Sequence, residues 1–161
     1  MERCATLVAV FAAIALPVSA WGQDAPEGTQ VGSESHSFTL ADAVTFEPLE
    51  VPGFDPGAQL AVLRGNPMAE SGTYTVRLRF PDGYRFPAHY HPRPENLTVL
   101  SGTFLIAMGT DENWDAIEKY SPGAFLYFPP EQPHYGGAEG ETVIQLHGEA
   151  PFEIVLANGA D

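Results

Sequence analysis

A pair of histidines followed by a glutamate has the residue types and the spacing of a metal site. His89 and His91 are two residues apart, so both imidazoles project from the same face if this segment is an extended strand. A chain that turns through Pro92 and Pro94 can then bring Glu95 back beside them. These three side chains are therefore candidate ligands on one face.

His134 supplies a fourth candidate ligand from a separate segment of the chain. With His89, His91 and Glu95 it offers three nitrogen atoms and one carboxylate oxygen. A metal ion that accepts about six ligands would keep two neighbouring positions open for water, dioxygen or a bidentate substrate. Imidazole and carboxylate suit manganese, iron, nickel, cobalt, copper or zinc, so we expect one divalent transition metal ion as cofactor.

His147, Arg77 and Arg79 could join this site, depending on which way their strands face. His147 and Gln145 share one face of an expected strand over 142–147. If that face looks inward, His147 is the candidate catalytic residue, as a proton donor and acceptor; if it looks outward, His147 is a surface residue. The arginines are expected to face outward, because arginine is rarely placed in cores; otherwise one could bind an anionic substrate group.

The elements that must carry these side chains are short strands. From Phe38 onward, short apolar runs are cut by proline, glycine and asparagine, which is typical of strands separated by turns. The expected strands cover 44–50, 58–63, 73–80, 96–108, 125–128, 142–147 and 152–156. Gly136-Gly137 is one of the turn signals between them, and only 113–119 has a helical pattern. The spacing predicts a single all-β domain, either a closed barrel or a two-sheet sandwich.

The charge of the chain excludes several classes of partner. Twenty-one acidic residues stand against 7 basic ones, which gives a net charge of −14 at pH 7. Such a surface repels phosphate backbones and anionic lipid, so neither nucleic acid nor a membrane surface is an expected partner. A small-molecule ligand or substrate is the expected one.

Residues 1–20 have the pattern of a secretory signal peptide. Arg3 precedes an apolar run, which ends at Pro17 and is followed by small residues up to Ala20, the expected cleavage site. The mature chain is therefore expected to be exported, either periplasmic or secreted, and free of the membrane after cleavage. Residues 21–37 are polar and predict a flexible N-terminal arm. The one cysteine, Cys4, falls within the signal peptide, so the mature chain has neither disulfides nor thiolate ligands.

The histidine-rich stretch resembles the first motif of the cupins, G-x5-H-x-H-x3,4-E-x6-G. Every fixed position of that motif is matched, by Gly83, His89, His91, Glu95 and Gly102. The resemblance implies that the histidines and the glutamate are metal ligands.

The second cupin motif, G-x5-P-x-G-x2-H-x3-N, is matched in part. Gly123, Pro129 and His134 match it, whereas Glu131 stands where glycine is usual and Ala138 where asparagine is usual. Those two departures affect turn geometry and a structural polar contact, and they leave the His134 ligand intact.

The resemblance implies a cupin-type double-stranded β-helix, a jelly-roll barrel, over residues 38–161. Three further stretches are similar to small exported bacterial cupins of unassigned activity, namely 76–92, 99–103 and 145–152. Small cupins often pair through their outer strands, so a homodimer is a family-level expectation.

Three functions are compatible with this pattern. The first is a metal-dependent enzyme of dioxygenase, decarboxylase or isomerase type that acts on a small organic molecule. The second is a non-catalytic, metal-stabilised barrel that binds or senses a small ligand. The third is a structural or partner-binding barrel in which the ligand set is residual.

Overall fold

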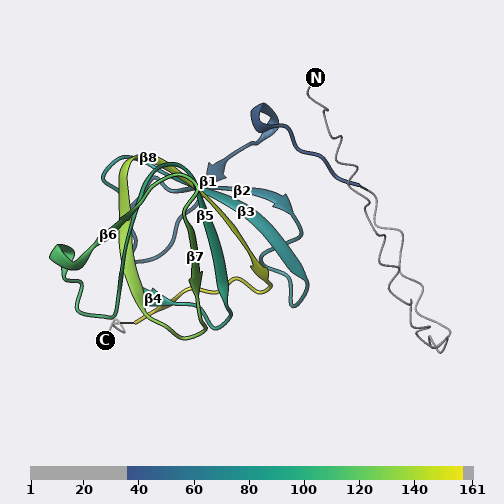
Figure 1. Cartoon of the computed structure of the whole chain (residues 1–161). Helices are drawn as coiled ribbons and strands as arrows, with labels where there is room; N and C mark the ends of the chain where they lie inside the picture. The colour runs from purple at the N-terminus through teal and green to yellow at the C-terminus, as the bar shows by residue number, and fades with distance from the viewer. Residues whose placement is uncertain (1–35, 158–161) are drawn as a thin grey trace, which may run out of the picture. The chain divides into compact units, whose positions relative to one another are not determined.

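Two long antiparallel strands, β5 (Glu95–Met108) and β8 (His134–Glu149), organise the fold. The computed structural model describes residues 36–157; the predicted signal peptide over 1–20 and nearly all of the predicted arm over 21–37 lie outside the described residues. β5 and β8 pair along most of their lengths, and both are long enough to bend and contribute to two parts of one curled sheet (Figure 1).

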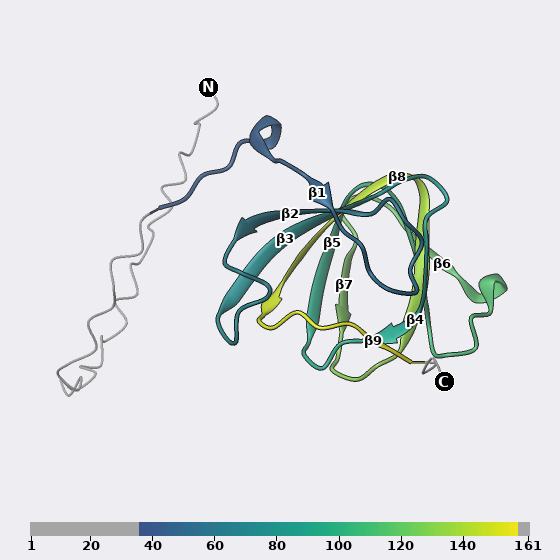
Figure 2. The same ribbon diagram turned by 180° about the vertical axis from the view of Figure 1, so that it is seen from behind.

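The bend divides the nine strands into two halves of a barrel. The first half contains β1 (Glu47–Pro48), β2 (Gln59–Arg64), β3 (Thr73–Phe80), the end of β8, the start of β5 and β7 (Phe125–Phe128). The second half contains β9 (Val155–Leu156), β4 (Arg85–Tyr90), the start of β8, the end of β5 and β6 (Glu118–Tyr120). Figure 2 shows β4 and β9 lying together along one rim of the barrel.

Gly102 lies where β5 bends. Its φ is +74°, a left-handed conformation that favours glycine, and a Cβ there would collide with Thr142 and with the backbone of Glu141. The register of the β5–β8 pair shifts on both sides of Ser101. Beside the bend, the Thr103 N–H donates to the Thr142 hydroxyl over 3.1 Å.

Side-chain alternation along the strands separates the barrel interior from its outer face. In β3, the even-numbered residues from Tyr74 to Phe80 are buried, and the odd-numbered residues face outward. Val76 and Leu146 are completely buried, and each such side chain contributes about 1.5–3 kcal/mol when it leaves water. The predicted all-β jelly-roll barrel of cupin type is confirmed.

Several expected elements differ from those in the structure. The Gly136-Gly137 turn is wrong, because both glycines lie inside β8, between the backbones of β4 and β5. A Cβ on Gly136 would collide with the Leu105 carbonyl, and one on Gly137 with the Tyr84 carbonyl. The close approach of the neighbouring strands therefore requires glycine at both positions.

The segment expected to be helical contains only one 3-10 turn, η2 (Trp114–Ala116), after which the chain extends into β6. A second 3-10 turn, η1 (Ala41–Ala43), precedes β1. Within residues 36–157, no helix has the length and apolar character needed to cross a membrane.

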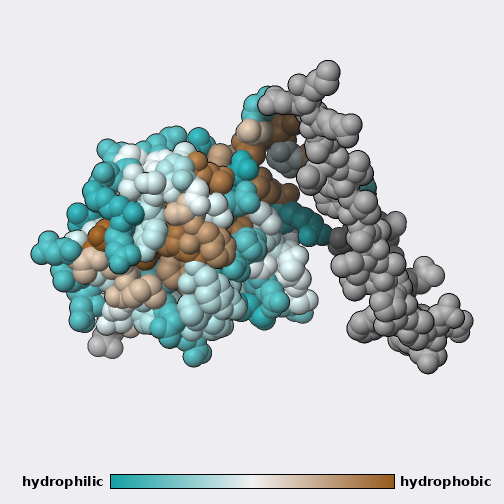
Figure 3. Space-filling view, viewed as in Figure 1, coloured by the Kyte–Doolittle hydropathy of each residue, from teal (hydrophilic) through white to brown (hydrophobic). Residues whose placement is uncertain are grey.

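Two aromatic residues of β7 lie on the outside of the barrel. Phe125 is 60% exposed and Tyr127 is 54% exposed. Their alternation with Leu126 and Phe128, which are buried, turns them outward. Figure 3 shows apolar surface on the face of the barrel where β5 and β7 lie.

Candidate metal centre

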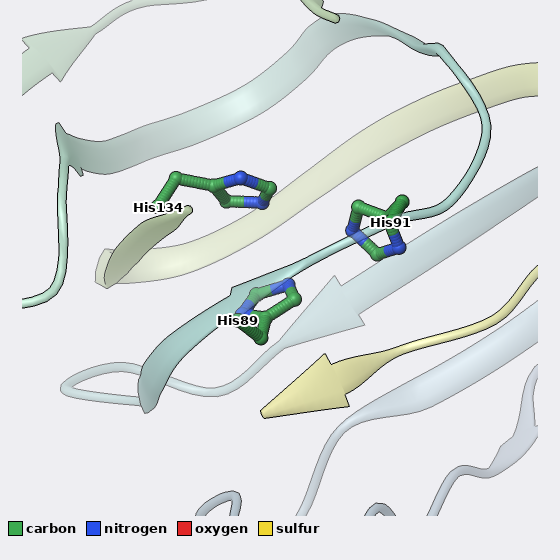
Figure 4. Close-up of side chains that lie close together, drawn as sticks. All are labelled: His89, His91 and His134. Atoms are coloured by element: carbon green, nitrogen blue, oxygen red, sulfur yellow. The ribbon is translucent and has the colours of Figure 1, made fainter. Parts of the chain in front are cut away.

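The four predicted ligand residues lie at the ends of three strands. His89 belongs to β4, His91 follows directly after it, Glu95 begins β5 and His134 begins β8. His89 and His134 face each other across the β4–β8 pair. All four residues are buried, with 3–6% of their surface exposed. Figure 4 shows the three imidazoles converging from β4, the loop after it and the start of β8.

The distances within this cluster fit a metal ion. One ring nitrogen from each of His89, His91 and His134 lies within 4.8 Å of the other two. The Glu95 Oε2 atom lies 3.6 Å from His91 Nε2 and 4.0 Å from His134 Nε2. The structure therefore brings together all four residues that the sequence singled out, and the three histidines could hold a metal ion.

Hydrogen bonds to the backbone determine which ring nitrogen of each histidine is free. The Nδ1–H of His89 donates to the Pro87 carbonyl over 2.9 Å. That of His91 donates to the Glu153 carbonyl over 2.7 Å, and that of His134 to the Gln132 carbonyl over 3.1 Å. A carbonyl oxygen can only accept, so each Nδ1 carries the proton and each Nε2 keeps its lone pair. A metal requires such lone pairs, and the donor set therefore fits one.

Burial keeps two of the imidazoles, those of His89 and His134, neutral. Desolvation, followed by the charges of His134 and His91, lowers the pKa of His89 from 6.5 to about 2. Desolvation and the charge of His91 lower the pKa of His134 to about 4, and burial raises the pKa of Glu95. His89 and His134 are therefore unprotonated at neutral pH, as ligands must be.

These shifts predict how the stability of the metal-free protein depends on pH. Below pH 6.5 the unfolded chain protonates His89 and His134 while the folded chain does not, so the free energy of unfolding falls as the pH is lowered. Glu95 opposes this trend, because its raised pKa stabilises the folded state at low pH and that contribution is lost as pH rises. Because two imidazoles oppose one carboxyl, the free energy of unfolding should fall by about 1 kcal/mol for each pH unit by which the pH is lowered near pH 5.

Urea unfolding of chelator-treated protein at about pH 7 and about pH 5 measures this slope. The H134A variant should show a smaller slope than wild type. A wild-type stability that is equal at the two pH values would contradict the assignment of neutral, buried imidazoles.

Each histidine ring packs against phenylalanine. The ring centroids of Phe128 and His134 are 4.5 Å apart, with the planes inclined by 17°, and those of Phe152 and His91 are 5.0 Å apart, at 21°. Phe54 lies 5.0 Å from His89. These contacts restrict the orientation of the imidazoles and keep water away from them.

His147 does not belong to this cluster. Ile144 and Leu146 of β8 fill the core, so the alternation of the strand places Gln145 and His147 on the outer face, where His147 is exposed. The inward orientation that would make it a catalytic residue is absent, which corrects that assignment. Arg77 shares this face, and its Nε donates to Gln145 Oε1 over 3.1 Å.

Arg79 also lies outside the cavity, with its guanidinium 4.0 Å from the centre of the Phe46 ring. Neither of the two arginines of β3 is therefore placed to bind an anionic group beside the histidines.

Replacing His147 by alanine is expected to leave both metal content and melting temperature unchanged. An exposed side chain on the outer face contributes within about 0.5 kcal/mol to stability. Elemental analysis and thermal unfolding of the variant beside wild type measure both quantities. Loss of metal in this variant would show that the ligand set is wrong.

The C-terminal segment contacts the histidines in ways that the sequence did not reveal. The Glu153 carbonyl accepts from His91, Phe152 packs on the same ring, and β9 pairs with β4 beside His89. A carbonyl has no sequence signature, and Phe152 was expected to begin a strand over 152–156, whereas only Val155–Leu156 form β9 and Phe152 lies in the segment before it.

Comparisons with known proteins agree with this fold. Residues 76–148 match the family described as "Cupin domain". The structure is similar to the polyketide cyclase RemF from Streptomyces resistomycificus, with a TM-score of 0.65, 15% identity, and coverage of 79% of this chain and 89% of that one. Curated protein sequences include no match.

Two further solved structures have similar folds. A putative acetylacetone dioxygenase from Methylibium petroleiphilum PM1 has a TM-score of 0.60 at 17% identity, and covers 79% of this chain and 85% of its own. The DMSP lyase DddQ from Ruegeria pomeroyi DSS-3 has a TM-score of 0.56 at 18% identity, and covers 80% of this chain and 75% of its own. Residues 76–148 therefore form a cupin domain, and the fold of the described residues is the cupin β-barrel.

Proposed function

We propose that this chain is a metal-dependent enzyme that acts on a small organic molecule. The observation that carries the proposal is the set of three buried Nε2 lone pairs, oriented by backbone carbonyls and accompanied by a carboxylate. The cofactor is one divalent transition metal ion. When bound, the ion supplies Lewis-acid polarisation of a substrate oxygen.

The residues around the site have distinct roles in this proposal. His89, His91 and His134 hold the ion, and Glu95 is close enough to complete the ligand set. Glu95 could carry a proton only if it leaves the metal, because a carboxylate ligand is held deprotonated by the ion. The phenylalanines around the imidazoles exclude water.

The reaction we propose is of dioxygenase, decarboxylase or isomerase type. A cavity of about 50 Å³ adjoins the histidines, which leaves room for a small reactant next to the ligands. Proteins of similar fold include a cyclase, a putative dioxygenase and a lyase. The signal-peptide pattern of residues 1–20 supports a location in the periplasm or outside the cell.

A non-catalytic barrel that binds or senses a small ligand is the second candidate. The placement of His147 on the outer face favours it, because within residues 36–157 the titratable groups that adjoin the cavity are Tyr84 and the four ligand residues. In this alternative the metal stabilises the fold and binds the ligand without turnover.

Elemental analysis of the protein, purified without a metal-binding tag, tests the proposal. We expect about one transition metal ion per chain, bound by wild type and absent from a variant that lacks His134. Absence of metal even after reloading with several divalent ions would contradict both candidate functions. A loaded protein that binds ligands without converting them would favour the sensing barrel.

A further inference from the structure

The cavity beside the histidines is apolar apart from the ligand residues themselves. Its lining comes from both halves of the barrel and includes Leu78, Phe104 and Ile144 from the interior. Among the described residues that line it, Tyr84 is the only one with a polar group besides His89, His91, Glu95 and His134, and no lysine, arginine, serine, threonine, asparagine or glutamine is present.

The absence of charged partners in the lining limits how a substrate can be held. The two arginines of β3, Arg77 and Arg79, lie on the outer face, engaged with Gln145 and Phe46. A negatively charged end of the substrate therefore has the metal ion as its only charged partner. The Tyr84 hydroxyl is the one other side-chain polar group in the lining, so further polar groups on the substrate would be buried without a side-chain hydrogen bond, which is unfavourable.

The volume of the cavity sets a second limit. It is about 50 Å³, whereas an engineered apolar cavity that binds benzene has about 150 Å³. Segments outside the central strands form part of its wall: Leu49, Val51 and Phe54 lie between β1 and β2, and Phe152 and Ile154 precede β9. A volume of this size favours a short chain over a ring.

We infer that the substrate is a short, compact molecule with one carboxylate or carbonyl end, bound by the metal, and an otherwise apolar body. This inference rests on the proposed function, since the metal holds the polar end. Sugars and polyols are disfavoured, because they carry several additional polar groups and the lining offers only the Tyr84 hydroxyl besides the ligand residues.

Phe54 is the residue that we expect to limit the length of the substrate. Its ring lies 5.0 Å from the His89 ring and 6.0 Å from the Phe86 ring, so it forms the wall of the cavity next to the ligands. Phe54 is half-buried and belongs to a loop between two strands, so its truncation enlarges the cavity without removing a core side chain.

Titration of the cobalt(II)-loaded protein with matched carboxylates tests this inference, with the visible absorption of the ion as readout. Acetate, propionate and butyrate should bind progressively more tightly, by about twofold to fourfold per methylene group, until the cavity is filled. Butyrate should bind at least about tenfold more tightly than 3-hydroxypropionate, which has the same shape but a hydroxyl at its far end.

The F54A variant should shift the preferred chain length upward when it is compared with wild type at equal cobalt loading. F125A is the matched control: it removes the same side chain from the outer face, where Phe125 is 60% exposed, and should not alter the preference.

The cobalt content, measured first, separates the two ways of failing. A protein that takes up no cobalt contradicts the proposed function. A loaded protein that binds 3-hydroxypropionate as tightly as butyrate, or that binds none of the four carboxylates, overturns the inference and leaves the metal site in place.

Discussion

Replacing His134 by alanine should reduce metal occupancy from about one ion per chain to nearly none, and should lower the melting temperature. The substitution removes one of the three imidazoles that converge in the cluster. It also removes the ring that stacks on Phe128 at 4.5 Å, in a position that is only 3% exposed. Loss of a buried ring of this size costs about 2–4 kcal/mol, and loss of the metal adds to it.

Thermal unfolding with and without chelator separates these two costs. Wild type should lose stability when the chelator removes its metal, whereas H134A should show no chelator effect. H147A, which removes an exposed imidazole, should behave as wild type does. If H134A keeps full metal content and still responds to chelator, His134 is not a ligand.

Replacing Gly136 by alanine is expected to prevent the chain from folding. Gly136 lies in β8 between Phe86 of β4 and Ile106 of β5. A Cβ at this position would collide with the backbone carbonyl of Leu105 and would lie 3.0 Å from the Phe86 ring. A backbone carbonyl in a paired strand cannot move aside, so we expect a loss of more than about 3 kcal/mol.

Gly83 provides the matched control for this substitution. Its φ of +76° is unfavourable for alanine, but a Cβ there would meet nothing within 4 Å. G83A should therefore lose only about 1–2 kcal/mol, the cost of the backbone conformation alone. Urea unfolding followed by circular dichroism compares the two variants. If both variants lost the same free energy of unfolding, the close approach of the neighbouring strands would not be the reason for glycine at position 136.

The clustering of the four candidate ligands could be predicted from the sequence because most of the information for it is local. His89, His91 and Glu95 lie within seven residues, so strand periodicity and a short turn determine that they share a face. The prediction that His134 joins them depended on the spacing of a second motif. The structure confirms that these four side chains lie together.

Features that depend on strand partners could not be predicted in this way. Pro87 lacks an N–H and interrupts the β4 pattern, yet it is accommodated where the β4–β8 register shifts between Phe86 and His89. Gly136-Gly137 has the composition of a turn, and only the packing of three strands reveals its other use. The outward orientation of His147 likewise depends on which neighbours fill the core.

The hydrogen bond between His91 and the Glu153 carbonyl also affects the order in which the site assembles. Its partners are 62 residues apart in the chain, so it belongs to the slowly formed, long-range contacts of the barrel. Before it forms, the His91 ring can carry its proton on either nitrogen. The Nδ1–H tautomer of His91 is therefore fixed only when the C-terminal segment docks. Before that step, either ring nitrogen of His91 can carry the lone pair that binds an ion.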